Sequence, residues 1–445
     1  MNIVIINKSD STGGAAVVSR RLMEALRAEG ADARMLVVEK LTDSPVVEVA
    51  APPEKSMMPF LAERLRIFLA NGLDRGTLFK VDAASDGLPL WEHPLVRTAD
   101  AVLLNWVNQG MLSLRGVRKI LELGKPVVWT MHDMWCMTGI CHHAGECGRY
   151  TEECGRCPFL GKMKRGNDLS RRVWKRKKTL YGSGAICFVA VSRWLAGRAA
   201  ESSLLGSERV EVIPNAFRIP DAPADVPSGK IPPDEHGISA PEIIGGSAPV
   251  ITLLFGAARL DDPIKGLPVL TEMTRVMREK YPRLAEKMEI VTFGGVKDRA
   301  SLSGFAITHR HMGTVSGEDK VRKLYENADI LVSSSSYETL PGTLVEAQAY
   351  GCIPVSFDRG GQADIVTHMA DGYLAEYSDN IKLAAAHLAD GVAWAAAIVE
   401  NPDEYGEIRK RMRRNVEERF AARKVARRYL RLLEDMLGER KTRGF

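Results

Sequence analysis

Residues 2–38 have the sequence NIVIINKSDSTGGAAVVSRRLMEALRAEGADARMLVV, and this stretch decides the fold. A short apolar run comes first, a glycine turn follows, and apolar residues then recur at helical spacing before a second apolar run. The four segments are a strand, Asn2–Asn7; a turn, Gly13–Gly14; a helix, Val17–Glu29; and a strand, Arg34–Val38. This order is the βαβ unit of a doubly wound parallel sheet.

The same alternation of strand and helix patterns continues along most of the chain. Further strands are expected at Ala101–Leu104, Val127–Thr130, Ile186–Ser192, Val210–Pro214, Ile251–Phe255, Met288–Phe293, Ile330–Ser333 and Pro354–Phe357. Helices are expected at Leu267–Lys280, near Asp319–Asn327, and at Leu344–Ala349. Residues 216–249 interrupt the alternation, because they are rich in proline and have almost no apolar periodicity.

These patterns and the length of 445 residues predict two α/β domains. We expect two Rossmann-like doubly wound domains that face each other across a cleft, where the carboxyl ends of the strands bind ligands. The predicted parts are a first domain, 1–215, with an insertion, 135–178; a linker, 216–249; a second domain, 250–407; and a basic C-terminal helix, 408–445. The apolar stripe of that helix is expected to pack on the first domain.

The composition is that of a globular protein, with 45% hydrophobic and 26% charged residues. No run of about 18 apolar residues occurs and the N-terminus lacks a basic region, so we expect a cytoplasmic protein. The net charge of +5 is unevenly placed: residues 162–178 carry +8, residues 408–445 carry +9, and the remainder carries −12. Two solvated helix faces explain this distribution, and contact of residues 162–178 with an anionic membrane is the alternative.

Two glutamates stand eight positions apart in the segment 333–347, SSSSYETLPGTLVEA. Glu338 lies in a polar loop after the strand Asp329–Ser333, and Glu346 lies in the helix that follows. Carboxylates accept paired hydrogen bonds, so both could hold the vicinal diols of a sugar or a ribose. From spacing alone, two ordinary surface glutamates are the favoured interpretation.

The spacing of these glutamates resembles the signature of the retaining glycosyltransferases of family 4, which have the GT-B fold. The resemblance implies that Glu338 approaches the transferred sugar and that Glu346 holds the nucleotide ribose. It also implies donor contacts at Gly342, Thr343 and Leu344, where backbone amides of the family often touch sugar or diphosphate. The family usually has Phe-Gly-Leu or Phe-Gly-Met after the first glutamate, and this chain has Thr-Leu-Pro-Gly.

Three further segments resemble the same family. In residues 255–266, FGAARLDDPIKG, the resemblance makes Arg259 and Lys265 the cations that neutralise the leaving diphosphate. Residues 359–366, RGGQADIV, resemble a G-G-x-x-E-I-V motif with Asp in place of Glu. Residues 212–215, VIPN, resemble the V-I-P-N-G end of the first domain, which makes Asn215 a donor-binding candidate.

In the first half, Gly13 and Gly14 lack the G-x-G-x-x-G pattern of a dinucleotide fingerprint, which disfavours NAD. The resemblance places this loop near the diphosphate and acceptor, and a simple tight turn is the alternative. His132 follows the strand Val127–Thr130. By resemblance it lies beside the donor sugar and shapes the pocket, and a core or surface histidine is the alternative.

The resemblance therefore implies a retaining hexosyltransferase with a UDP- or GDP-sugar donor and a glycan or lipid-linked glycan acceptor. It implies same-face attack with no cofactor required for catalysis, and no nucleic-acid partner. A GT-B sugar-nucleotide epimerase or hydrolase is one alternative. A non-enzymatic polyanion-binding protein with a zinc knuckle is another, and it explains the basic segments but leaves both glutamates without a role.

Four cysteines lie within 17 residues: Cys141, Cys147, Cys154 and Cys157. Their spacing resembles a structural zinc knuckle, because thiolates suit Zn²⁺. Unligated thiols and two disulfides are the alternatives. The W-x-x-T-G-x-C pattern that ends at the first of these cysteines resembles a subset of the family that acts on bacterial surface polysaccharides.

Overall fold

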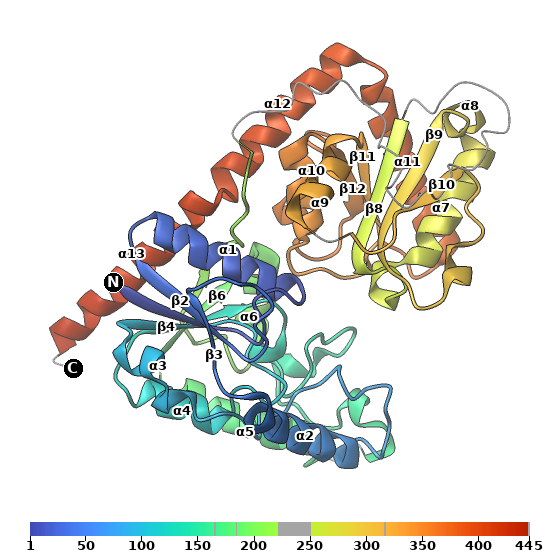
Figure 1. Ribbon diagram of the computed structural model, residues 1–445. Helices are drawn as coiled ribbons and strands as arrows, with labels where there is room; N and C mark the ends of the chain where they lie inside the picture. Colours follow the sequence, from blue (N-terminus) through green and yellow to red (C-terminus); the bar gives the residue numbers. More distant parts are fainter. Residues whose placement is uncertain (164–165, 184, 221–250, 316, 444–445) are drawn as a thin grey trace. The chain divides into compact units, whose positions relative to one another are not determined.

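A computed structural model describes residues 1–163, 166–183, 185–220, 251–315 and 317–443 (Figure 1). The chain forms two compact units, Met1–Phe217 with Ala422–Phe445, and Arg218–Ala421. Most of the predicted linker, 216–249, lies outside the described residues. Its first two residues, Ala216 and Phe217, are buried in the first unit, so that unit extends two residues past the predicted boundary.

The first unit contains a seven-stranded parallel sheet in the order β3-β2-β1-β4-β5-β6-β7. The strands are β1 (Asn2–Ile6), β2 (Asp32–Val37), β3 (Val47–Val49), β4 (Ala101–Leu104), β5 (Val127–Met131), β6 (Ile186–Ala190) and β7 (Val210–Val212). The central strands β4, β5 and β6 are buried along their whole length, because helices cover both faces of a parallel sheet.

The helices of the first unit are α1 (Gly14–Ala28), α2 (Pro53–Ala70), α3 (Pro94–Thr98), α4 (Leu114–Leu121), α5 (Leu169–Tyr181), α6 (Arg193–Glu201) and α13 (Ala422–Arg443). Short 3-10 turns occur at Leu90–Glu92, Trp135–Met137, Gly148–Thr151 and Pro158–Met163. Three of these turns lie in the predicted insertion, which therefore has little regular structure before α5.

The second unit contains a six-stranded sheet in the order β10-β9-β8-β11-β12-β13, also parallel. Its strands are β8 (Ile251–Arg259), β9 (Met288–Gly295), β10 (Thr308–His311), β11 (Ile330–Ser333), β12 (Ile353–Phe357) and β13 (Tyr373–Ala375). Its helices are α7 (Leu267–Lys280), α8 (Pro282–Ala285), α9 (Glu318–Glu326), α10 (Gly342–Tyr350), α11 (Ile381–Val399) and α12 (Pro402–Arg419), with 3-10 turns at Pro263–Lys265, Arg299–Leu302 and Gly361–Asp364.

Both sheets continue outward on either side of their first strand, so the prediction of two Rossmann-like doubly wound units is confirmed. Among the described residues, α11 is the helix long and apolar enough to cross a membrane. One face of α11 lies in the core of the second unit, as Ala384, Leu388 and Ala395 show, whereas Leu383 near its start is exposed. It is therefore placed as a core helix of that unit.

The predicted C-terminal helix that returns to the first domain is present as α13, but its predicted bounds, 408–445, are wrong because two helices share that region. Helix α12 packs Ile408 and Met412 into the core of the second unit, whereas α13 packs its apolar stripe into the core of the first. The stripe consists of Val425, Ala426, Tyr429, Leu432, Leu433 and Met436. The Tyr429 hydroxyl also hydrogen-bonds Thr130 Oγ1 on β5 at 3.0 Å, so α13 is an integral part of the first unit.

We predict that Leu433→Ala destabilises the first unit by about 2–5 kcal/mol, because it removes a fully buried side chain and leaves a cavity. The neighbouring substitution Glu434→Ala, on the exposed face of α13, is the control and should change stability by less than about 0.5 kcal/mol. Urea unfolding of the full chain measures both. Equal stability of the two variants would show that α13 is not part of this core.

Candidate active site

An ion pair joins two loops at the carboxyl ends of neighbouring strands in the second unit. The Lys265 ammonium donates to Glu338 Oε1 at 2.6 Å. Lys265 ends the turn that follows β8, and Glu338 lies in the loop between β11 and α10. Their side chains are 30% and 21% exposed, so both charges remain accessible to a ligand. The structure thus brings together two of the residues that the sequence singled out.

Close backbone packing holds these loops together. Gly266 has φ +69°, and a Cβ at this position would lie 2.1 Å from the Ser334 carbonyl oxygen. The Ser334 hydroxyl donates to the carbonyl oxygen of Lys265 at 2.8 Å, and the Ser336 amide donates to that of Ile264 at the same distance. Glycine is therefore required at position 266, because any side chain would force the two loops apart.

Two further glycines, Gly360 and Gly361, allow close packing against the backbone of Glu338 itself. The Gly361 amide donates to the Glu338 carbonyl oxygen at 2.9 Å. A Cβ on Gly360 would lie 2.2 Å from that oxygen, and one on Gly361 would lie 1.9 Å from the Thr339 carbonyl oxygen. The 359–366 motif therefore fixes the position of Glu338 from the other side of the loop.

Arg259 ends β8 and pairs with a different carboxylate. Its Nε donates to Asp261 Oδ1 at 3.1 Å, and Asp261 also accepts the Lys297 amide at 3.0 Å. The amide of Lys297, together with Arg259, lowers the pKa of Asp261. The Arg259 side chain is 49% exposed. Arg259 and Lys265 lie on the same stretch of chain, but each pairs with a different carboxylate.

Helix α10 carries the remaining donor candidates of the second unit. It begins at Gly342, so the amides of Gly342 and Thr343 lie in its first turn, where helices favour phosphate groups. Glu346 Oε2 accepts a hydrogen bond from the Tyr325 hydroxyl at 3.2 Å, and this bond orients the carboxylate. The Leu344 side chain is fully buried in the unit, so its side chain serves packing.

In the first unit, His132 and Asn215 line one pocket. His132 follows β5 and is half-buried, and Asn215 follows β7. Asn105, Thr130 and residues of α1 and α13 complete the lining. The structure therefore brings together the two candidates that the sequence placed at the ends of strands in the first domain.

Burial lowers the pKa of His132 to about 4, although the adjacent Asp133 carboxylate opposes this shift. The imidazole is therefore neutral at neutral pH and can both donate and accept a hydrogen bond. A neutral imidazole suits contact with a hydroxyl group better than contact with a phosphate.

The glycine turn after β1 is open. Gly13 precedes α1 with φ +86°, and a Cβ on Gly13 or Gly14 would meet no atom within 4 Å. Residues 11–14 are exposed, so their backbone is accessible to a ligand. Space alone does not demand glycine here; the positive φ of Gly13 does.

Sequence reasoning missed a polar cluster beside His132. Asp133 accepts hydrogen bonds from His142 Nδ1 at 2.7 Å and from Trp106 Nε1 at 3.1 Å. Burial opposes ionisation of Asp133, but the charge and hydrogen bond of His142 outweigh it and lower its pKa to about 2. Burial likewise opposes charge on His142, yet Asp133 raises its pKa. The His-Asp dipeptide after a strand was the available signal, but the partners of Asp133 lie 9 and 27 residues away and follow no recognisable spacing.

The four cysteines of the insertion line one small pocket. The Gly139 amide donates to Cys154 Sγ at 3.2 Å, and burial raises the pKa of Cys141 to about 12. Within the part of the chain that the structure describes, no three His, Cys, Asp or Glu residues are arranged to hold a metal ion. The cysteines thus gather without forming a ligand set, and zinc binding stays a prediction.

Comparison with known proteins gives a consistent picture. Residues 258–419 match the family described as glycosyl transferases group 1. The chain is 25% identical over 304 residues to WcaC of Escherichia coli K12, a glycosyl transferase assigned to colanic acid biosynthesis; the match covers 65% of this chain and 67% of WcaC. It is 32% identical over 100 residues to the amylovoran biosynthesis glycosyltransferase AmsD of Erwinia amylovora, which covers 21% of this chain and 28% of AmsD.

Solved structures resemble nearly the whole chain. The Anabaena protein Alr3699/HepE, in complex with UDP and glucose, has a TM-score of 0.57 and 15% identity, covering 97% of this chain and 99% of its own. WaaG, a glycosyltransferase involved in lipopolysaccharide biosynthesis, has a TM-score of 0.59 and 13% identity, covering 97% and 99%. At these identities the likeness establishes the fold, which is that of the GT-B glycosyltransferases.

We predict that Gly266→Ala separates the two loops and destabilises the second unit by at least about 2 kcal/mol more than Gly313→Ala. Gly313 is a matched control, because its φ of +65° is nearly the same but its Cβ would meet no atom. Thermal unfolding of both variants measures the difference. Equal destabilisation would mean that only the positive φ matters and that the close approach to Ser334 does not.

The zinc prediction is tested by metal analysis of the purified full chain. Zinc binding requires the four cysteine sulfurs to move together from their present positions. If zinc binds, the purified chain should contain one zinc ion, and its cluster thiols should react only after a chelator removes the metal. Cys187→Ser is the control, because this cysteine lies outside the cluster. Zinc-free protein with reactive thiols in the insertion would contradict the prediction.

Proposed function

We propose that this chain, whose residues 258–419 match the group 1 glycosyl transferases, is a retaining hexosyltransferase that uses a UDP- or GDP-sugar. The proposed acceptor is a glycan or a lipid-linked glycan of a bacterial surface polysaccharide. The names of WcaC and AmsD support polysaccharide biosynthesis, and the UDP and glucose bound to HepE support a nucleotide-sugar donor. The Lys265–Glu338 pair is the observation that carries the proposal.

The second unit has the groups that a nucleotide sugar requires. Lys265 and the half-exposed Arg259 supply positive charge for a diphosphate, and the first turn of α10 supplies backbone amides. Glu338 accepts hydrogen bonds from sugar hydroxyls, and Glu346 accepts them from the ribose. Diphosphate binding would draw Lys265 away from Glu338, which frees the carboxylate for the sugar.

The proposed chemistry breaks one bond and forms one bond on the same face of the sugar. The bond from the anomeric carbon to the diphosphate oxygen lengthens, and negative charge develops on that oxygen. Lys265 and Arg259 stabilise this charge, which is the main contribution of the protein to the step. The acceptor oxygen then bonds to the anomeric carbon, and its proton passes to the departing phosphate oxygen.

The first unit contributes groups suited to hydroxyls. The neutral imidazole of His132 can donate to a hydroxyl of the transferred sugar or accept from it. Asn215 lines the same pocket and offers an amide for the same purpose. The open Gly13–Gly14 loop exposes backbone next to the start of α1, which suits close approach of a ligand.

We predict that Lys265→Ala and Glu338→Gln each lower sugar transfer by more than about 100-fold while the chain stays folded. Lys287 and Glu400 form an exposed ion pair of similar length in the same unit, so Lys287→Ala and Glu400→Gln are matched controls that should leave turnover unchanged. Transfer is measured with a panel of UDP- and GDP-sugars.

The exchanged double variant, Lys265→Glu with Glu338→Lys, separates binding from simple structural support. A pair that only joins two loops should be restored by the exchange, so recovered turnover would contradict the proposed roles. We expect no recovery, because the exchange puts a carboxylate where the diphosphate must bind. Near wild-type turnover in both single variants would also contradict the proposal.

A further inference from the structure

Helix α2 of the first unit points its apolar side chains outward and several polar side chains inward, the reverse of an ordinary surface helix. Its outward face carries large apolar side chains that are 52–72% exposed: Met57, Met58, Leu61, Leu65 and Leu69. Most of these recur every four residues, so they form one stripe along the helix. Its inward face instead buries Ser56, Glu63, Arg64 and Ile67.

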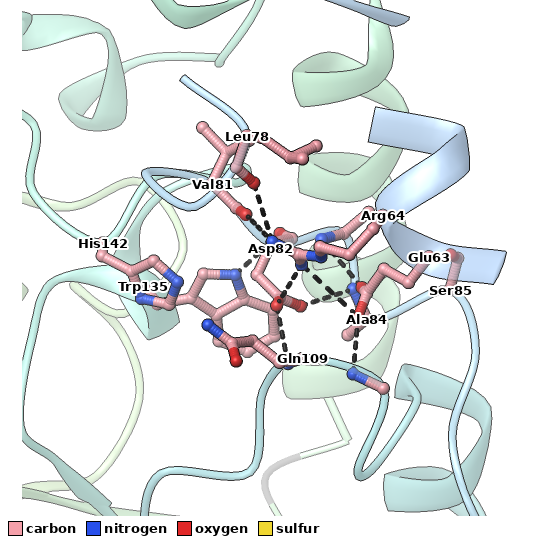
Figure 2. Close-up of polar contacts among 12 residues, drawn as sticks. Glu63, Arg64, Leu78, Val81, Asp82, Ala84, Ser85, Gln109, Trp135 and His142 are labelled. Atoms are coloured by element: carbon pink, nitrogen blue, oxygen red, sulfur yellow. Dashed lines mark hydrogen bonds and ion pairs between the residues drawn. The ribbon is translucent and has the colours of Figure 1, made fainter. Parts of the chain in front are cut away.

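A buried network of charged side chains explains why the polar face of α2 points into the protein. Figure 2 shows Glu63 and Arg64 extending from the helix toward Asp82 and the loop that contains Gln109. Arg64 Nη2 donates to Asp82 Oδ2 at 2.8 Å, and Asp82 also accepts the Gln109 amide at 2.7 Å. Glu63 accepts the Gly110 amide at 2.7 Å and the Ala83 amide at 3.1 Å.

This network cannot be turned outward without losing those bonds. Leaving a buried charge without its partner costs several kcal/mol, so the polar face of α2 is fixed toward the protein. The apolar stripe is consequently fixed toward the outside. Water is a poor environment for such a contiguous stripe, and stripes of this kind mark sites that bind another apolar surface.

A basic groove lies between α4 and α5 of the same unit. Arg115 and Arg118 on α4, and Lys175 and Arg176 on α5, line this groove with Leu114 and Leu180. All four cations are exposed, and in the described parts of the chain none of them forms an ion pair. Arg171 and, more weakly, Lys175 lower the pKa of the Glu153 carboxyl, so Lys175 has one carboxylate nearby. Four exposed cations in one groove nevertheless favour an anionic ligand.

The groove and the stripe are linked through the loop that precedes α4. Gly110 packs against α2, because a Cβ on it would lie 2.4 Å from the Phe60 amide nitrogen, and α4 begins four residues later. In Figure 1, α4, α5 and α2 lie along one edge of this unit. An apolar stripe with cations beside it is the composition of a surface that binds anionic membranes.

We propose that α2 and the α4–α5 groove form a docking surface for an anionic phospholipid membrane, with the stripe among the acyl chains and the groove on headgroup phosphates. A soluble phosphate would use the cations but would have no use for the stripe. This surface shares Lys175 and Arg176 with the predicted contact through 162–178. In the same segment, Lys177 is buried on Trp135 and Arg171 pairs with Glu153.

The test is flotation of the full chain with vesicles of phosphatidylcholine alone or mixed with phosphatidylglycerol. Vesicles are used without donor or acceptor, so the result is independent of the proposed sugar transfer. We expect binding only to the mixed vesicles, weakened by salt but not displaced by inorganic phosphate at the same ionic strength. Binding abolished by inorganic phosphate alone would identify a soluble anion as the ligand and contradict the proposal.

Two sets of variants separate the parts of the surface. Changing all four groove cations to Gln, and separately changing Leu61 and Leu65 to Ser, should each lower vesicle binding by roughly tenfold or more. The control changes Lys287, Lys320, Lys382 and Lys410, all exposed in the second unit, to Gln, with the same loss of charge and no expected effect.

Circular dichroism and thermal unfolding confirm that each variant is folded, which is expected because the altered side chains are exposed. Light scattering gives the oligomeric state of each protein. A dimer that the Leu61 and Leu65 changes abolish, without vesicle binding by the wild type, would show that the stripe binds a second copy and would overturn the lipid assignment.

Discussion

The close approach of three backbone segments in the second unit is the constraint on which the candidate site depends. Gly266 lets the turn after β8 touch the loop after β11, and Gly360 and Gly361 let a third segment touch the same loop. The resulting contact places a lysine and a glutamate 2.6 Å apart at the carboxyl ends of two adjacent strands. In open α/β sheets this is where ligands bind, so the constraint lies at the same position as the proposed nucleotide-sugar site.

The two units carry complementary chemistry. The second provides cations, carboxylates and a helix start, which suit a diphosphate and its sugar. The first provides a neutral histidine and an asparagine around one pocket, together with an open glycine turn. On the outer surface of the first unit, helix α2 turns its polar face inward, where Glu63 and Arg64 join Asp82 in a buried network. Its apolar stripe is therefore exposed. The proposed membrane docking would bring the proposed sugar transfer close to a lipid-linked acceptor.

The sequence predicted most of the strands, because those of a buried parallel sheet are short apolar runs that periodicity detects. It also singled out Lys265 and Glu338, which the structure brings together, because the glycines and charged residues lie in short local motifs. It did not predict α2, whose apolar residues face outward, nor the break between α12 and α13, which depends on which core each helix joins. The contacts of Asp133 with His142 and Trp106 were also missed, since they depend on how three separate loops fold against one another and follow no periodic spacing.

Hydrogen exchange of the full chain with saturating UDP or GDP tests the central claim most directly, because it locates nucleotide contact on individual segments. Binding by one of the two nucleotides should slow exchange in the backbone amides of 263–266, 338–343 and 360–361, the three segments that the glycines hold together. Saturation that leaves all three segments unprotected, or no binding of either nucleotide, would contradict the assignment of this site to a nucleotide sugar.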